Sequence, residues 1–398
     1  MSGLLLPILL LGCTPDVTKL YATERVSALA VATGVPPNWK PDAAVAIAAP
    51  ELALALRKVI RTALSADHPA IQLPLPLGIQ ATLTPQLEVK SVKIALTTDC
   101  AACFSVQIAL EGQARWEAGP ASGSVPISAA ASAILAASIH NGNEVDVRPN
   151  RIESLTVDVP SLGNLRVNAS GPVQEWLRQT IANKLPPIRV ATLDKGALPV
   201  RDMRLSATPD RLAIEILSDV PGASPLRALP SPTSGVEVAM SESVISGIAR
   251  RAAYQAGTLA MDVAADPRGL VVDGSAFTLE LRLWRLVGRG WYRDYEVVGD
   301  IGVKADGRSK LTFEAKTAKE TASSPGALLV DPLAALFESR ILDAIVTAMD
   351  QSLPAQTQQN VAGVRLRAVA TDARGLDDAL HLYGTLDVDE GGTGPARR

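Results

Sequence analysis

Residues 235–259, GVEVAMSESVISGIARRAAYQAGTL, show how this chain is built. A short apolar strand at residues 236–240 runs into Ser241 and Ser243, either of which can cap the first turn of a helix. Apolar residues then recur at three- and four-residue intervals, which predicts a helix with one apolar face. They are Val244, Ile245, Ile248, Ala249, Ala252 and Ala256. Gly257 stands where a helix commonly ends in a left-handed glycine.

This stretch resembles a family of lipid-binding proteins that includes bactericidal/permeability-increasing protein, lipopolysaccharide-binding protein and phospholipid transfer protein. The resemblance rests on Met240-Ser241-Glu242, on the apolar helix, and on residues 254–259, YQAGTL. It implies an α+β fold of two tandem domains, each with a long helix packed in a highly twisted antiparallel β-sheet. It also implies an apolar tunnel for acyl chains. The alternative is an ordinary surface helix on a sheet, which would show the same apolar stripe.

The composition bounds the possible functions. The chain has 398 residues, enough for two or three domains, and 47% of them are hydrophobic although only 4% are aromatic. Its net charge of −3 gives no electrostatic attraction to nucleic acid. We therefore expect no nucleic-acid partner and an interior built mainly from aliphatic side chains.

The first residues resemble an export signal. Residues 4–11 form an apolar run too short to span a membrane, and Leu10-Leu11-Gly12-Cys13 resembles a bacterial lipobox, in which the cysteine is acylated after cleavage. This predicts a signal peptide at 1–12, a lipid anchor on Cys13, a lead segment at 13–40 and an outer-membrane lipoprotein facing the periplasm or the cell surface. A generic signal peptide with an incidental cysteine is the alternative.

The other two cysteines, Cys100 and Cys103, lie between two strand-like runs. A redox pair or half of a zinc site would need a βαβ context, a second CxxC or a nearby histidine, and the sequence provides none of these. We expect a local disulfide that braces the end of a hairpin, as an exported protein allows.

The chain divides into two similar halves. A strand at 43–49 precedes a helix that starts near Pro50, which repeats the order seen at 236–256. A Pro- and Ser-rich segment at 218–234 has no periodicity and reads as a linker. We therefore expect an N-terminal lipid-binding domain at 41–217, a C-terminal one at 235–389 and a flexible tail at 390–398.

The predicted lipid-binding residues are the inward apolar side chains of the helices. They are Leu52, Leu56, Val59, Ile60 and Ala63 in the first helix; Val173 and Leu177 in a second; Val244, Ile245, Ile248, Ala252 and Leu259 in the third; and Phe337, Ile341 and Ile345 in the last. Whether these side chains line an open tunnel or fill it is not determined by the sequence. Arg57, Lys58 and Arg61 fall on the other side of the first helix, as a solvated face or a contact for anionic headgroups.

Enzymatic motifs are missing from the sequence. None of the three histidines sits in a catalytic motif, and no GxSxG, HExxH or Walker-type loop occurs. Asp387, Asp389 and Glu390 read as the polar side of a strand end rather than as a cation site. We expect a protein without catalysis, cofactor or metal. A cluster of aromatic residues at 284–295 indicates either a membrane or partner interface, or cross-strand pairing.

These patterns predict a membrane-tethered lipoprotein that binds a phospholipid or another acyl-chain lipid and carries or holds it. The rival hypothesis, from another class, is a structural lipoprotein that contacts envelope proteins and has no ligand.

Overall fold

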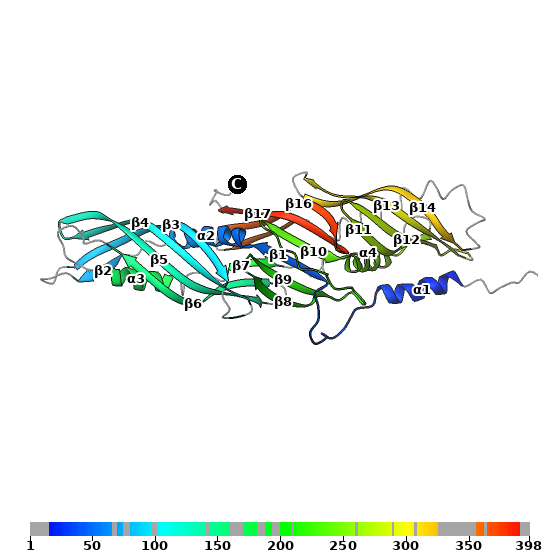
Figure 1. The fold of residues 1–398 in the computed structure, drawn as a ribbon, viewed down its shortest axis with the longest axis horizontal. Helices are drawn as coiled ribbons and strands as arrows, with labels where there is room; N and C mark the ends of the chain where they lie inside the picture. Colours follow the sequence, from blue (N-terminus) through cyan, green and yellow to red (C-terminus); the bar gives the residue numbers. More distant parts are fainter. Residues whose placement is uncertain are drawn as a thin grey trace, which may run out of the picture.

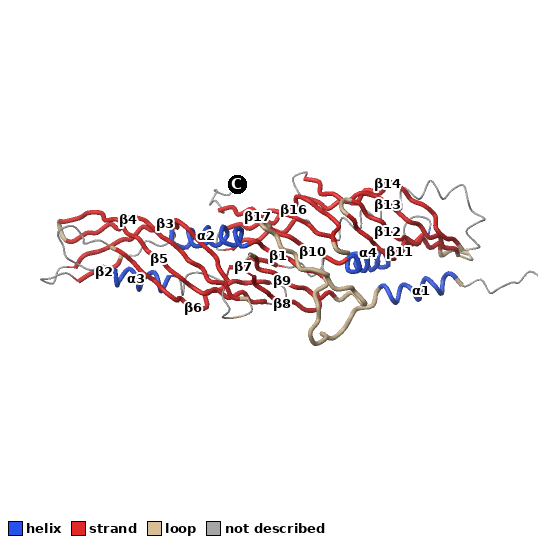
Figure 2. Tube along the Cα trace, viewed as in Figure 1, coloured by secondary structure: helices blue, strands red, loops and turns tan. Residues whose placement is uncertain are grey.

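The computed structural model is elongated and consists mostly of antiparallel β-sheet (Figure 1). It describes residues 16–65, 70–74, 80–96, 100, 102–140, 144–159, 170–180, 188–192, 200–208, 210–258, 262–288, 290–305, 309–324, 356–361 and 364–390. Figure 2 shows that its helices are short compared with the long strands they pack against.

A six-stranded meander forms one end of the molecule, on the left in Figure 1. Apolar and polar residues alternate along its strands, so one face of the sheet is buried and the other is hydrated. Its strands are β2 (Ile71–Pro74), β3 (Gln80–Leu96), β4 (Cys103–Ala118), β5 (Ala121–His140), β6 (Glu144–Asp158) and β7 (Ile188–Thr192). The helices α2 (Ala49–Ser65) and α3 (Ser170–Gln179) pack against this sheet.

A four-stranded meander forms the opposite end. Its strands are β11 (Val263–Asp273), β12 (Ala276–Arg285), β13 (Trp291–Ala305) and β14 (Ser309–Ser323). The helix α4 (Glu242–Ala256) packs against β11. As predicted, the hydroxyl of Ser241 accepts a hydrogen bond from the backbone N–H of Val244, and Gly257 ends the helix with a φ of 77°.

A seven-stranded sheet joins the two ends. Its order is β15-β16-β17-β10-β1-β9-β8, and every pairing in it is antiparallel. The strands are β1 (Ala43–Ala48), β8 (Val200–Thr208), β9 (Arg211–Ser218), β10 (Val236–Ser241), β15 (Gln356–Val361), β16 (Val364–Leu376) and β17 (Ala379–Glu390). Because β1 pairs with both β9 and β10, the two predicted halves share one continuous sheet at the centre of the molecule.

Two connecting segments are more ordered than their composition indicates. The lead segment contains a helix, α1 (Val17–Ala28), which Asp16 caps through its carboxylate. The Pro- and Ser-rich segment is irregular but hydrogen-bonded to the rest of the protein: the N–H of Leu226 donates to the carbonyl of Pro41, and the N–H of Ser231 donates to Glu237. Residues 126–139, whose structure the sequence left undecided, belong to β5.

A buried carboxylate fastens the first strand to β9. Asp42 is 2% exposed and accepts hydrogen bonds from both the N–H and the hydroxyl of Ser218, at 2.8–3.1 Å. Burial, partly offset by these hydrogen bonds, raises the pKa of Asp42 above its usual value.

This raised pKa predicts a pH dependence of stability. Between the ordinary aspartate pKa of about 4 and the higher pKa of Asp42 in the folded protein, Asp42 keeps its proton in the native state and loses it in the unfolded chain. The free energy of unfolding therefore falls as the pH rises through this range. Asp42→Asn removes the titration. The wild type is therefore expected to lose unfolding free energy relative to Asp42→Asn as the pH rises from about 4. Urea unfolding of both proteins across the pH range measures the difference, and a difference that grows in the opposite direction would contradict the assignment.

Candidate functional site

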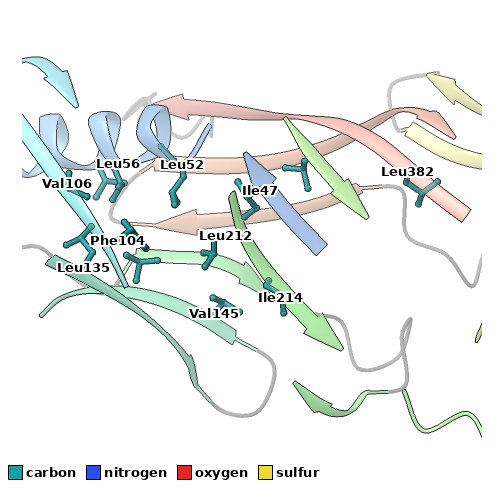
Figure 3. Packing of buried hydrophobic residues seen from close by; sticks show 14 of the residues in the cluster. Ile47, Leu52, Leu56, Phe104, Val106, Leu135, Val145, Leu212, Ile214 and Leu382 are labelled. Carbon is teal, nitrogen blue, oxygen red and sulfur yellow. The ribbon is translucent and has the colours of Figure 1, made fainter. Parts of the chain in front are cut away.

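The predicted lipid-binding side chains of α2 point into the protein. Leu52, Leu56, Val59 and Ile60 are each at most 6% exposed and belong to one large apolar cluster. Figure 3 shows Leu52 and Leu56 pointing from α2 toward Phe104 and the strands below it. Ala63 lies in the last turns of α2, where only the backbone is described. Among the residues that the structure describes, these four side chains are packed against their neighbours and face no open tunnel.

The shorter helix α3 contributes to the same cluster. Val173 and Leu177 are fully buried, and the amide of Gln174 donates to the carbonyl of Leu155 at 2.7 Å, which ties α3 to β6. The sequence predicted the burial of these two side chains, because they lie one turn apart on the apolar face of a helix, and their role in lipid binding stays a prediction.

On α4 the buried face is narrower than the sequence indicated. Val244, Ile245 and Ala249 are buried, and Ile245 and Ala249 join the same apolar cluster as α2. Ile248 and Ala252 are only partly buried. Val220, in the Pro- and Ser-rich segment, packs directly against Gly247 of α4. The contact is so close that a methyl group on Gly247 would lie only 2.4 Å from the Val220 side chain. Leu259, Phe337, Ile341, Ile345 and Cys13 lie outside the described residues.

A small hollow lies where the first turn of α2 meets the central sheet. Its volume is about 10 Å³, room for roughly one water molecule. The lining is mainly apolar, and its residues come from α2, β3, β4, β8 and β9. They are Ala49, Leu52, Ile94, Phe104, Ala207, Thr208, Arg211 and Leu212.

Two polar residues at this hollow carry unsatisfied atoms. Thr208 Oγ1 and Arg211 Nε are both buried, and neither has a hydrogen-bond partner in the described structure. A buried polar atom without a partner costs about 1–3 kcal/mol, so such atoms usually have a water or a ligand nearby. The backbone holds this corner firmly, because the N–H of Ala49 donates to the carbonyl of Asp210 at 2.7 Å.

Sequence reasoning missed Thr208 and Arg211. They flank a turn between two strands of the central sheet, and their neighbours at the hollow come from α2 and from strands more than a hundred residues earlier in the chain. Only Leu52 belongs to both the predicted set and the hollow. An isolated Thr or Arg next to a turn carries no sequence signal of such a role.

The cysteine pair is a disulfide, as predicted. Cys100 and Cys103 are bonded, with a Cα–Cα distance of 5.1 Å, and they sit at the turn between β3 and β4. Phe104, which follows directly, faces the interior and lines the hollow. The disulfide therefore braces the end of the hairpin that supplies one wall of the site.

The structure describes one paired histidine. His381 Nδ1 lies 2.7 Å from Glu237 Oε1, and both side chains are less than 10% exposed within the central sheet. Among the described residues, no three His, Cys, Asp or Glu side chains gather where they could hold a metal ion. The backbone at Asp387, Asp389 and Glu390 is part of β17, and their side chains are not described.

The aromatic cluster at 284–295 is partly internal. Trp284 is fully buried and pairs across the strands with Tyr292, with 5.6 Å between the ring centroids. Cross-strand pairing thus accounts for these two residues. Within the described part of the chain, no helix has the length and apolar character required to cross a bilayer.

The fold and the site together define an elongated, mostly antiparallel protein with aliphatic helices against curled sheets and a small amphipathic hollow between them. The sequence matches no family model and no curated protein. Among solved structures, the chain is similar to lipopolysaccharide binding protein, with 14% identity over 88% of this chain and 99% of that one and a TM-score of 0.47.

It is also similar to P47 from Clostridium botulinum A2, at 10% identity, 87% and 97% coverage and a TM-score of 0.36. A further similar structure is P47 of Clostridium botulinum E1, at 9% identity, 88% and 100% coverage and a TM-score of 0.39. TM-scores below 0.5 describe a loose likeness, so we base the function on the geometry of this chain.

Proposed function

We propose that this protein binds a lipid with its acyl chain between α2 and the six-stranded sheet and its polar part beside Thr208 and Arg211. One observation carries this proposal: two buried polar atoms, which have no hydrogen-bond partner among the described residues, sit at the edge of a hollow that is otherwise lined by aliphatic and aromatic side chains. A lipid matches both parts of this site, because its acyl chain can contact the apolar lining while its polar part forms hydrogen bonds with Thr208 and Arg211. A polar metabolite would match only the polar atoms, and a hydrocarbon only the apolar lining.

Binding requires the interior to open. A hollow of about 10 Å³ holds no acyl chain, so α2 and the sheet must separate for the chain to enter. Each methylene withdrawn from water contributes about 0.8 kcal/mol, and the chain replaces contacts that the apolar side chains make with one another. Aliphatic side chains tolerate this exchange because they form no directional bonds that would be lost.

The rest of the proposal concerns the membrane anchor, the cellular location and the mode of action. We propose that Cys13 carries the lipid anchor, that the protein is exported to the outer membrane, and that it acts by binding without catalysis. The two lipid-binding domains of the sequence prediction remain part of this proposal, with the shared central sheet between them.

Lipid extraction separates the carrier from the ligand-free scaffold. The protein is produced without residues 1–13, purified without detergent and extracted with organic solvent, and the extract is quantified by mass spectrometry. Lipid at a constant molar ratio supports the carrier. A repeated lack of lipid, together with no uptake from phospholipid vesicles, would favour the scaffold.

Filling the hollow should reduce lipid binding. Ala207→Leu adds bulk at the lining of the hollow, where Ala207 is partly buried, and is expected to lower the amount of co-purified lipid several-fold with little loss of stability. Ala121→Leu, at an exposed position at the start of β5, serves as the matched control and should leave lipid binding unchanged. Equal lipid content in both variants would place the lipid elsewhere.

A further inference from the structure

The helix α1 packs against the C-terminal end of the molecule, although it stands at the start of the chain. Val17, Tyr21 and Ala28 form a separate apolar cluster with Tyr254, Ala264 and Trp284, which belong to α4, β11 and β12. The ring of Tyr21 lies 5.2 Å from that of Tyr254 and 5.9 Å from that of Trp284. All members of this cluster are at most 9% exposed.

Charged groups fix the same contact. Glu24 of α1 pairs with the guanidinium of Arg250 on α4, whose Nε donates to the buried Asp266 at 2.6 Å. The segment after α1 is held as well, because Arg251 donates to the carbonyl of Ala30 and the N–H of Ala32 donates to the carbonyl of Asp219. The described part of the lead segment is therefore docked on the fold.

The first residue of α1 lies at the tip of the C-terminal end. A methyl group on Gly290, in the turn between β12 and β13, would lie 3.1 Å from Val17 Cβ. In Figure 1, α1 begins beside the right-hand ends of these strands. Val287 in the same turn is 51% exposed, an apolar side chain presented at the tip.

We propose that the C-terminal end of the molecule, at the β12–β13 turn, rests against the phospholipid bilayer and that the six-stranded end points away from it. This inference rests on the proposed anchor at Cys13. Two residues, Thr14 and Pro15, lie between Cys13 and Asp16, so an acylated Cys13 is three residue steps, at most about 10 Å, from the start of α1. Because α1 is fixed to the C-terminal end, the anchor brings that end to the membrane.

The orientation gives the two ends different roles. The β4–β5 turn is the far tip: Ala118 lies fourteen residues along β4 from Phe104, about 45 Å at 3.3 Å per residue. The hollow lies between this tip and the membrane-bound end. The six-stranded end and the hollow beside Arg211 are thus free to meet a second surface or a lipid donor.

Energy transfer to a labelled bilayer tests the orientation. The thiol of Cys13 is the one available for coupling, since the other two cysteines of the chain form the disulfide. The protein, beginning at residue 13, is attached to phosphatidylcholine vesicles through a maleimide lipid, and the vesicles carry a headgroup acceptor dye. The donor dye is placed by an azido-phenylalanine at either of two exposed positions, Val287 or Ala121.

We expect several-fold more energy transfer from position 287 than from position 121. Tyr21→Asp, which puts a charge into the apolar cluster, should undock α1 and remove most of this difference while the protein stays attached. Lys19→Ala, at a residue whose side chain is 85% exposed on the same helix, should preserve it. Equal transfer from the two positions, or more from position 121, would overturn the orientation.

A separate measurement covers the anchor itself. The full chain is expressed in a Gram-negative bacterium, and the mass of the membrane-bound mature protein shows whether Cys13 is acylated. An acylated mass supports the orientation in the cell. An unmodified mass would remove the anchor, and with it the orientation in the cell, whereas lipid binding at the hollow is decided independently by the extraction experiment.

Discussion

Arg250→Met is expected to lower the free energy of unfolding by about 3–5 kcal/mol, because it leaves a buried carboxylate without its partner. Asp266 is fully buried, and its Oδ1 accepts from Arg250 Nε at 2.6 Å. Arg250 also holds Glu24, so the same change loosens α1. Tyr254 and Asp266 are both fully buried, so this corner is poorly hydrated, and burial together with the Asp266 carboxylate raises the pKa of Tyr254.

The control is an ion pair of the same type on the surface. Arg374 and Asp372 pair at 2.7 Å with side chains 66% and 45% exposed, and Arg374→Met should cost less than about 1 kcal/mol. Removing both charges with Arg250→Met and Asp266→Leu should be less destabilising than Arg250→Met alone, since no unpaired charge remains. Urea unfolding measures all of these variants. Similar costs for Arg250→Met and Arg374→Met would show that Asp266 is hydrated.

Leu56→Ala is expected to lower the free energy of unfolding of the lipid-free protein by about 2–5 kcal/mol. Leu56 is 1% exposed and packs in the main apolar cluster beneath α2, where its removal leaves a cavity. The reason is the close packing around Leu56: a side chain that lined an open tunnel would have fewer contacts to lose.

A second leucine on α2 provides the comparison. Leu54 is 41% exposed, and Leu54→Ala should change stability by less than about 0.5 kcal/mol, the usual range for surface substitutions. Chemical denaturation of delipidated protein gives both values. If Leu56→Ala matched Leu54→Ala in stability but abolished lipid uptake, Leu56 would line a ligand space already open in the free protein.

Local patterns predicted local structure well. Ser241 and Gly257 mark the ends of α4 because capping depends on residues within one turn. The burial of Leu56 and Leu177 follows from the spacing of apolar residues on a helix. Ile248 and Ala252 are less buried than expected. The spacing of apolar residues shows which side of the helix faces the interior, but it does not show how much of that side the neighbouring elements cover.

The sequence alone determined the elements of this protein: alternating strands, apolar helix faces, a cap, and a disulfide between residues three apart, all of which depend on neighbours along the chain. The tertiary structure decided which elements meet. It joined β1 to β9 and β10 in one central sheet, docked α1 on α4, and placed Arg211 and Thr208 beside Leu52. Such contacts follow from strand register and packing between residues far apart in the chain, and no short stretch of sequence encodes them.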